Sequence, residues 1–298
     1  MPIPAPVTRS GLAAVETGTA LLQRIRGADP VADLFEAAEL QWWWAKERST
    51  DTVDQLFWFD EQGPVAAAIL TDWGSGDSML YSDPTLLVAT LPGMPLDDVA
   101  AALDAGRAHA AALGIASVSL EADRDDAAMQ AVLSECGFER VEDALLQCWL
   151  DLGDRPDVSM LEDGYELRDR VGAAGTAHHL AKPGRGDVDA RLRQGSLYRD
   201  DLDLFVVAPD GEVAGFALCW FDPVTATAVI EPVRTRDAHQ RRGISRHLLT
   251  AGLDRVARLG ATRAAIGYEP DNPASDPLYR SLGFVPHRRT DLLSGPTS

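Results

Sequence analysis

The chain has 298 residues, of which 46% are hydrophobic and 24% are charged, so it can bury a core and is long enough for two domains of about 150 residues. The 46 Asp and Glu residues against 27 Lys and Arg residues give a formal net charge of −19, which argues against nucleic acid because its phosphates would be repelled. No apolar run reaches the roughly 20 residues of a membrane span, and the N-terminus lacks a secretory hydrophobic stretch, so we expect a cytoplasmic protein that does not contact membranes.

Three cysteines, Cys136, Cys148 and Cys219, lie in apolar helix or strand patterns without CxxC spacing. We interpret them as small buried hydrophobic residues rather than as disulfide or zinc ligands.

Early in the chain, "QWWWAKERS" contains three consecutive tryptophans, Trp42, Trp43 and Trp44. Three neighbours on one helix cannot all point inward. We expect one or two of them in the core and one at an interface between domains or between subunits of a homodimer, with a stacking site for a ligand as the alternative. The segment "DQLFWFDEQGPVAAAILTDW" then predicts a β-hairpin.

An internal repeat follows. Residues 105–138 align without gaps on residues 251–284, at an offset of 146 residues, and each copy predicts helix, Leu-Gly stop, strand, polar loop, second helix and Gly-Phe. A stretch rich in proline and acidic residues, 151–167, separates the copies. We therefore predict two domains of one α+β fold, over 1–155 and 160–298, each a mixed, mostly antiparallel sheet flanked by helices.

The second half has its own hairpin, "DLDLFVVAPDGEVAGFALCWFD", and then a β-branched strand that ends near Thr235. The next segment, "HQRRGISRHLL", begins a helix whose apolar residues recur at helical spacing from Ile244 until Gly260. The free amides and the positive dipole at this helix start form an anion site, Gly243 allows close approach, and the arginines add charge. A diphosphate fits such a loop.

The segment "EPVRTRDAHQRRGISRHLL" followed by "NPASDPLYRSLGF" resembles the GNAT family of acyl-CoA-dependent N-acyltransferases. The phosphate loop of that family reads R/Q-x-x-G-x-G/A, and here it comprises Gln240, Arg241, Arg242, Gly243, Ile244 and Ser245. The late signature of the family matches Asn272, Tyr279, Gly283 and Phe284. Ser245 stands where the family has Gly or Ala, so we expect a slightly altered phosphate contact without loss of binding.

The resemblance implies a cofactor arm lying along a strand. In the family, the strand before the loop is bulged and splays from its neighbour, and its amides pair with the pantetheine of acetyl-CoA. By position these residues are Val233, Arg234 and Thr235, and the N–H groups around Val233 and Arg234 would stabilise the oxyanion. Pro232 suits a place where the ladder is interrupted.

The resemblance also assigns the chemistry. Tyr279 would protonate the leaving thiolate, with a plain core tyrosine as the alternative. Glu231 would act as base, directly or through water, with pairing to a nearby arginine as the alternative. Asn272 would hold the loop or touch the cofactor arm, although an ordinary turn asparagine fits equally.

We expect the acceptor pocket to be built from residues 178–202 and the hairpin end around Trp220, which either lines the pocket or lies in the core. His178 and His179 attract attention as a base or as ligands. Adjacent histidines on a helix cannot both face one ligand, and no Cys or acidic residue lies at metal spacing from them, so we predict no metal.

The first domain is predicted to be a degenerate copy that does not bind CoA. The repeat offset places Met94, Pro95, Leu96 and Asp97 where the second half has Gln240–Gly243, and it replaces Tyr279 by Leu133 and Asn272 by Asp126. No Arg or Lys occurs from Thr71 to Gly106.

Together these patterns predict an acetyl-CoA-dependent N-acetyltransferase that transfers directly, in a ternary complex, to the amine of a small molecule or a protein. A non-catalytic acyl-CoA-binding sensor or scaffold is one alternative. A mycothiol-synthase-like acetyltransferase, which also carries two copies of this fold, is another. The presence of both Tyr279 and Glu231 favours an enzyme.

Overall fold

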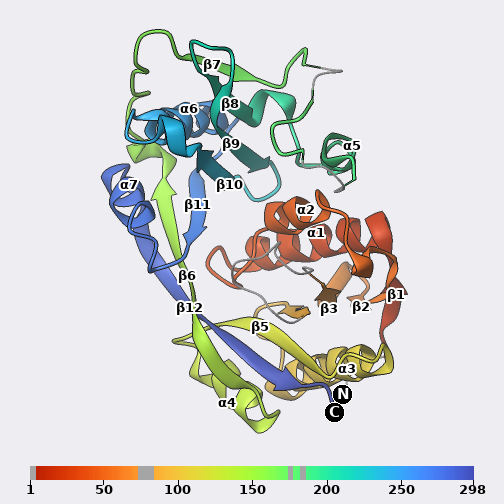
Figure 1. Cartoon of the computed structure of the whole chain (residues 1–298). Coiled ribbons are helices and arrows are strands. Elements are labelled where there is room, and N and C mark those ends of the chain that lie inside the picture. Colours follow the sequence, from red (N-terminus) through yellow and green to blue (C-terminus); the bar gives the residue numbers. More distant parts are fainter. Residues whose placement is uncertain (1–4, 73–83, 174–176, 182–185) are drawn as a thin grey trace. The chain divides into compact units, whose positions relative to one another are not determined.

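The computed structural model describes residues 5–72, 84–173, 177–181 and 186–298, which form two compact units (Figure 1). The first unit comprises residues 1–40, 47–146 and 288–298, and the second comprises 41–46 and 147–287. The sequence places the domain boundary at 155–160. The units cross that boundary, because the last residues of the chain return to the first unit.

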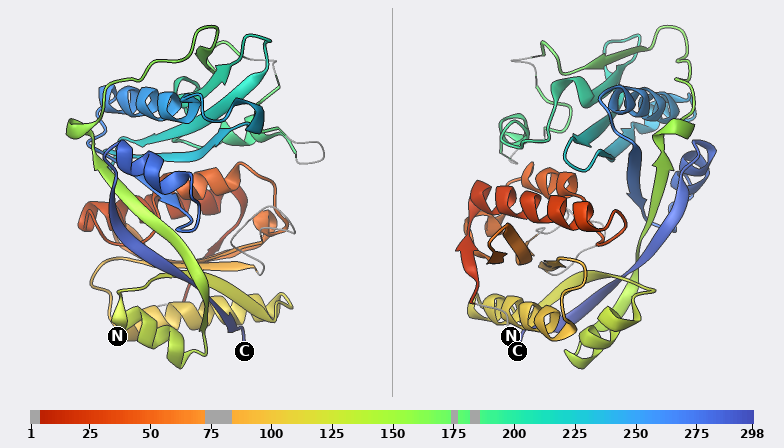
Figure 2. Two further views of the ribbon diagram at one scale, coloured as in Figure 1. Left: turned by 60° about the vertical axis from the view of Figure 1, so that its left-hand side comes forward. Right: turned by 180° about the vertical axis from the view of Figure 1, so that it is seen from behind.

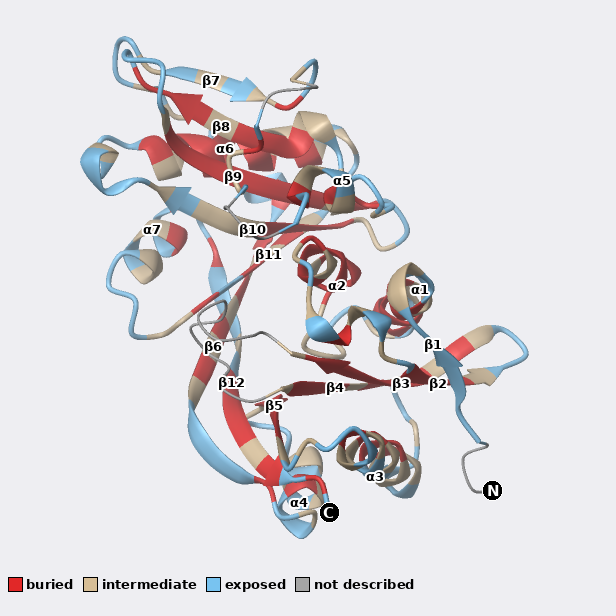
Figure 3. Cartoon of the chain, turned by 45° about the vertical axis from the view of Figure 1, so that its right-hand side comes forward, coloured by how far each residue is buried: buried red, intermediate tan, exposed pale blue. Residues whose placement is uncertain are grey.

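The first unit is a sheet with helices on both faces. Its strands lie in the order β1-β2-β3-β4-β5-β12-β6, and α1 and α3 cover opposite faces of the sheet (Figure 3). The elements are β1 (Val7–Arg9), α1 (Gly11–Ala28), α2 (Ala37–Trp44), β2 (Gln55–Asp60), β3 (Gly63–Thr71), β4 (Thr85–Thr90), α3 (Leu96–Ala112), β5 (Ser117–Asp123), α4 (Ala127–Glu135), β6 (Glu139–Asp151) and β12 (Val285–Pro296).

Small residues set the spacing between α3 and this sheet. A Cβ on Gly106 would lie 3.0 Å from the Cβ of Ala68 and 3.0 Å from Leu86, so the missing side chain lets α3 approach β3 closely. Leu103, on the same helix, is buried with Leu86 and Leu120 in the hydrophobic core between the sheet and α3. The buried residues of this helix therefore face the sheet.

The second unit contains the end of β6, followed by the strand order β11-β10-β9-β8-β7. Helix α6 packs along β8, β9 and β10 (Figure 2). The elements are β7 (Glu166–Asp169), α5 (Val188–Leu192), β8 (Asp203–Val207), β9 (Val213–Asp222), β10 (Thr227–Thr235), α6 (Ile244–Arg258), β11 (Arg263–Tyr268) and α7 (Ser275–Ser281). Short 3-10 turns lie at Leu152–Asp154, Asp200–Leu202 and Asp237–His239, and in the first unit at Ser49–Thr52.

The predicted α+β fold and the repeated order of elements are confirmed. In the first unit α3, β5 and α4 lead to Gly137-Phe138, and in the second α6, β11 and α7 lead to Gly283-Phe284. Both glycines have positive φ, 79° and 95°, and each ends the helix before its phenylalanine. Phe138 and Phe284 are both buried. The two copies thus close their last helix in the same way.

Two of the three neighbouring tryptophans are buried, Trp42 and Trp43, while Trp44 is partly exposed. Within the second unit, Trp44 Nε1 donates to Gln194 Oε1 at 2.9 Å, and the Arg191 guanidinium lies 3.7 Å from a Trp44 ring centroid. The prediction of one or two core tryptophans therefore holds within the described residues.

All three cysteines are free, and Cys136 is partly exposed where burial was expected. None of the described helices is both long enough and apolar enough to span a membrane.

Candidate active site

The second unit contains a strand that keeps one neighbour and leaves the other. β10 pairs with β9 from Thr227 to Thr235, but its parallel pairing with β11 covers only Thr227 to Val229. Beyond Val229 the two parallel strands diverge. The edge of β10 from Ile230 to Thr235 is therefore open toward the β11 side, where an extended ligand can add as a further strand.

A bulge lies where this edge begins. The register of β10 against β9 shifts between Ile230 and Val233, and the two residues between them are Glu231 and Pro232, joined by a cis peptide bond. Proline has no N–H to contribute to a ladder. The sequence predicted an interruption at Pro232, and the structure has it there. Ile230 is buried, whereas Val233 is partly exposed and Arg234 is exposed.

The open edge leads through a 3-10 turn into the loop that was predicted to bind phosphate. Arg241 and Gly243 both have positive φ, 64° and 75°, and Gly243 is the N-cap of α6. No side chain caps the helix start, and no acidic residue lies in its first turn. Alternating left-handed residues at an uncapped helix start turn several N–H groups outward, which is the geometry of an anion site.

Gly243 is required for its backbone conformation rather than for lack of space. A Cβ on Gly243 would meet nothing within 4 Å, so the face above it is open. Any other residue would have to adopt φ near 75°, which costs about 1 to 2 kcal/mol for a residue with a side chain.

Two hydroxyl contacts fix the start of α6. Thr235 Oγ1 and Ser245 Oγ lie 2.6 Å apart and share a hydrogen bond, which ties the end of β10 to the first turn of the helix. Arg246 Nη1 donates to Ser281 Oγ at 2.7 Å and links α6 to α7. Ser245, the one departure from the family pattern, therefore makes a bond that Gly or Ala could not make.

The cations of the loop are exposed and weakly engaged. Arg242 pairs with Glu162 at 2.9 Å, but both side chains are about half exposed, so this pair contributes little stability. Gln240 donates to Asp237 Oδ1 at 3.1 Å within the preceding turn. Arg242 can exchange its carboxylate partner for an incoming phosphate without a large loss of stability.

Tyr279 lies in α7 with its ring in an aromatic cluster. Its centroid is 5.1 Å from that of Tyr268 and 6.1 Å from that of Phe284, and only 8% of the residue is exposed. Burial raises the pKa of Tyr279 to about 12, a hydrogen bond with Ser275 opposes the shift, and the charge of Glu231 adds to it. Tyr279 is therefore a protonated phenol at neutral pH, and it lies within electrostatic reach of Glu231.

The backbone at Glu231 is anchored by a buried indole. Trp220 Nε1 donates to the Glu231 carbonyl at 2.9 Å, and Trp220 is almost fully buried. Trp220 thus lies in the core. The Glu231 side chain is partly exposed.

Asn272 serves the turn before α7. Its Oδ1 accepts a hydrogen bond from the backbone N–H of Ala274 at 3.1 Å, and its backbone N–H donates to the Glu269 carbonyl at 3.0 Å. These are the contacts of a turn asparagine.

The part of the second unit that contains this edge, loop and tyrosine is similar to a known family. Residues 176–284 match the model of the acetyltransferase (GNAT) family. Over these residues the chain is similar to a GNAT acetyltransferase domain. A solved structure shows the fold over nearly the whole chain: a tandem GNAT protein from the clavulanic acid biosynthesis pathway has a TM-score of 0.65 at 16% identity and covers 99% of this chain and 98% of its own.

Other relatives agree. A GCN5-related N-acetyltransferase from Sphaerobacter thermophilus has a TM-score of 0.58 at 17% identity, covering 100% of this chain and 97% of its own. Mycothiol acetyltransferases of Streptomyces avermitilis and Beutenbergia cavernae are 28% identical over 123 residues and 32% identical over 99 residues. Those alignments cover 41% and 33% of this chain and 40% and 33% of the relatives, so the match spans less than half of each curated relative.

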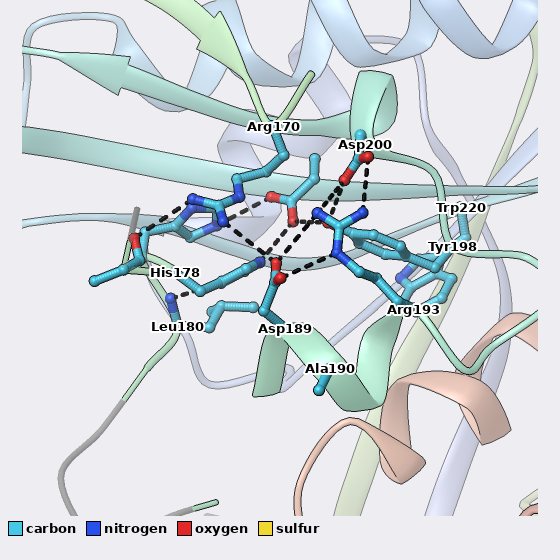
Figure 4. Close-up of polar contacts among 12 residues, drawn as sticks. Arg170, His178, Leu180, Asp189, Ala190, Arg193, Tyr198, Asp200 and Trp220 are labelled. Carbon is cyan, nitrogen blue, oxygen red and sulfur yellow. Dashed lines mark hydrogen bonds and ion pairs between the residues drawn. The ribbon is translucent and has the colours of Figure 1, made fainter. Parts of the chain in front are cut away.

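The second unit also contains a buried cluster that sequence reasoning missed (Figure 4). His178 Nε2 lies 2.8 Å from Asp203 Oδ2, and His179 Nε2 lies 3.1 Å from Asp203 Oδ1. Tyr198 donates to Asp203 Oδ2 at 2.9 Å. The argument that adjacent histidines cannot face one group was wrong, because residues 177–181 form a turn rather than a helix.

The proton positions in this cluster suit hydrogen bonds rather than a metal. His178 Nδ1 accepts the Leu180 amide at 3.1 Å, so the ring proton of neutral His178 is on Nε2, which donates to Asp203. A His that binds a metal through Nε2 keeps its proton on Nδ1. Among the described residues, the one group of candidate metal ligands is His178, His179 and Asp203. With the proton of His178 on Nε2, only His179 and Asp203 of this group could bind a metal.

No local signal could have found this cluster, because Asp203 is 24 residues from His179 along the chain and opens a strand in an ordinary hairpin pattern. Burial raises the pKa of Asp203, but the contacts with His178 and His179 outweigh it and hold the pKa well below its usual value. Burial also lowers the pKa of His179. The cluster therefore contains a buried carboxylate in contact with two imidazoles and a phenol.

Proposed function

We propose that the chain is an acetyl-CoA-dependent N-acetyltransferase whose second unit binds acetyl-CoA and transfers the acetyl group directly to an amine in a ternary complex. One observation carries the proposal: β10 leaves β11 after Val229, keeps β9 as far as Thr235 and ends at an uncapped helix start. An open strand edge suits the amides of pantetheine. The loop of Gln240, Arg241, Arg242, Gly243, Ile244 and Ser245 suits the diphosphate.

The chemistry then follows from the two groups near the open edge. The amine nitrogen attacks the thioester carbonyl carbon, a C–N bond forms, and the oxyanion accepts a hydrogen bond from the backbone N–H at Val233. The C–S bond breaks, and Tyr279 gives its proton to the thiolate. Glu231, directly or through water, takes the proton that the amine loses. A proton from solvent then converts the Tyr279 phenolate back to the phenol.

Two facts support these roles. The raised pKa of Tyr279 keeps its proton available at neutral pH. The Glu231 carboxylate is near enough to add to that shift, so the acid and the base lie within electrostatic reach of each other. A sensor or scaffold that only binds acyl-CoA would need neither group.

The acceptor is tested with a panel of amines. Because the curated relatives are mycothiol acetyltransferases, the unacetylated precursor of mycothiol is the first candidate, followed by other small amines and by lysine-containing peptides. The measurement is release of the CoA thiol from acetyl-CoA together with mass detection of the acetylated amine. We expect amine-dependent release with one acetyl group transferred per thiol. Tight acetyl-CoA binding without amine-dependent release across the panel would instead favour the sensor.

A further inference from the structure

The side chain of Trp220 points away from α6. A Cβ on Gly252 of that helix would lie 2.4 Å from Cys219 Sγ, so Cys219 faces α6. Successive residues of a strand point to opposite faces of the sheet, and Trp220 therefore lies on the other face of β9. Its ring is almost fully buried there.

Tyr198 packs against this ring (Figure 4). The ring centroids of Tyr198 and Trp220 are 6.3 Å apart at an interplanar angle of 66°, which is the edge-to-face arrangement that aromatic pairs favour. The Tyr198 hydroxyl donates to Asp203 Oδ2 at 2.9 Å. Tyr198 is thus fixed at its hydroxyl by a carboxylate while its ring contacts the indole.

The carboxylate that holds Tyr198 is itself fixed. Asp203 is fully buried, and its two oxygens contact His178 and His179. The ring centroids of His179 and Phe216 are 4.7 Å apart, and Phe216 lies on the same face of β9 as Trp220. Buried polar groups that bind one another in this way hold a single arrangement. The cluster therefore gives the Trp220 side of β9 a rigid cover.

Trp220 in turn holds a residue whose position the strand pairing does not set. The pairing of β10 with β9 passes from Ile230 to Val233, and its pairing with β11 ends at Val229. Glu231 therefore lies outside both recorded ladders. Nε1 of Trp220 donates to the Glu231 carbonyl at 2.9 Å, while the Glu231 side chain is partly exposed. This bond fixes the backbone at the place where the ladder is interrupted.

We propose that Trp220 and Tyr198 are positioning residues for Glu231. Trp220 holds the Glu231 backbone at the bulge, so that the carboxylate meets the acceptor amine. Tyr198, fixed by Asp203, keeps the indole in place. Both act through Glu231 rather than on the acceptor. The inference rests on the proposed function, because it gives these two side chains a part in removing the proton of the amine.

The test is a double-mutant cycle in the full chain, with the amine of the panel that gives the fastest CoA-thiol release as acceptor. Trp220→Phe removes the indole N–H. We expect kcat to fall about tenfold at neutral pH and to recover at higher pH, as for Glu231→Gln, while KM for acetyl-CoA is unchanged. The double variant Trp220→Phe/Glu231→Gln should be no slower than Glu231→Gln alone, because the position of this residue matters only while it carries the base.

Two further variants keep the test decisive. Tyr198→Phe retains the ring but loses the bond to Asp203, and it should lose about threefold in kcat at neutral pH with the same recovery at higher pH. It replaces Trp220→Phe in the cycle if thermal unfolding shows that Trp220→Phe does not fold. The matched control is Trp58→Phe, because Trp58 is as deeply buried but lies on β2 of the first unit. Its pH–rate profile should equal that of the parent.

The possible failures are distinguishable. If the parent shows amine-dependent release, the proposed function stands, and the positioning role is overturned by any of three results. These are a Trp220→Phe profile that matches the parent, a double variant slower than Glu231→Gln by the whole factor that Trp220→Phe loses alone, and a Glu231→Gln variant as active as the parent. If the parent releases no thiol with any amine of the panel, the proposed function fails and the positioning role fails with it.

Discussion

Burial of the Tyr279 ring and the nearby charge of Glu231 both favour the protonated phenol, and together they raise the pKa of Tyr279 to about 12. A group with a raised pKa keeps its proton until the pH approaches that value. The rate should therefore show no loss from ionisation of Tyr279 between about pH 7 and about pH 10.

Replacing Tyr279→Phe removes the acid but keeps the ring. We expect kcat to fall by about 10² to 10⁴ with little change in acetyl-CoA affinity, because the contacts with Tyr268 and Phe284 are retained. Tyr268→Phe is the matched control, since it removes a hydroxyl from the adjacent ring and should lower kcat far less. A Tyr279→Phe variant as active as the parent would leave Tyr279 a core residue.

The Glu231→Gln variant tests the base. It should depress kcat at neutral pH and recover part of the rate at higher pH, where more of the acceptor is free amine. The measurement is the pH–rate profile at saturating acetyl-CoA. If the profile keeps its shape and height, Glu231 has no part in proton removal.

Asp203 offers a prediction about stability. Its pKa in the folded state is held below the unfolded value of 3.8, so the stability it contributes is present above that value and is lost as the pH falls through and below it. Asp203→Asn should cost roughly 1 to 3 kcal/mol near neutral pH and should flatten the loss of unfolding free energy between about pH 5 and about pH 3. Urea titrations at several pH values measure this, with the exposed Asp163→Asn as control. Equal pH dependence in the parent and Asp203→Asn would contradict it.

Single residues also mark the limit of sequence reasoning. Gly243, Tyr279 and Glu231 lie within the family motifs or at a fixed spacing from them, so the sequence alone could identify them as candidate site residues. The bond between Ser245 and Thr235 depends on how the loop folds back between β10 and α6. The contact of His178 with Asp203 depends on how segments farther apart along the chain fold together, and one sequence reveals neither.

Among the elements, helix α6 was the easiest to predict. Its apolar period, its glycine at each end and its basic last turn are all local signals, and the structure has the helix over Ile244–Arg258. The divergence of β10 from β11 was expected only through the family resemblance, because local sequence gives no register between strands. Pro232 was the one local sign of the bulge.

The two end glycines of α6 provide a matched pair of variants. Gly243 and Gly260 both have positive φ, 75° and 105°, and a Cβ on either would meet nothing within 4 Å. Valine at either position should lower stability by about 1 to 2 kcal/mol through backbone strain. Only Gly243→Val should also weaken acetyl-CoA binding, by about tenfold or more, because it adds bulk at the anion site. Equal affinity in the two variants would place the diphosphate elsewhere. Calorimetry and thermal unfolding of both variants provide the comparison.

At the scale of the whole molecule, the duplication was visible because the repeat preserves the order of elements without gaps. The sequence could not show that residues 288–298 belong to the first unit, where β12 pairs with β5 from Thr290 to Pro296. Strand pairing between residues so far apart leaves no periodic signal. A fragment that stops near residue 155 would lack this strand, so the roles of the units must be tested in the full chain.

Titration of the full chain with acetyl-CoA tests most directly whether the second unit alone is the acetyl-CoA site. The loop at Gly243 has left-handed residues and no acidic first turn, while the corresponding helix of the first unit starts with Asp97 and Asp98. Calorimetry should therefore give one acetyl-CoA per chain, and Gly243→Val should weaken that binding by about tenfold or more while Gly260→Val retains it. Two acetyl-CoA molecules per chain, or one that still binds with undiminished affinity in Gly243→Val, would contradict the account.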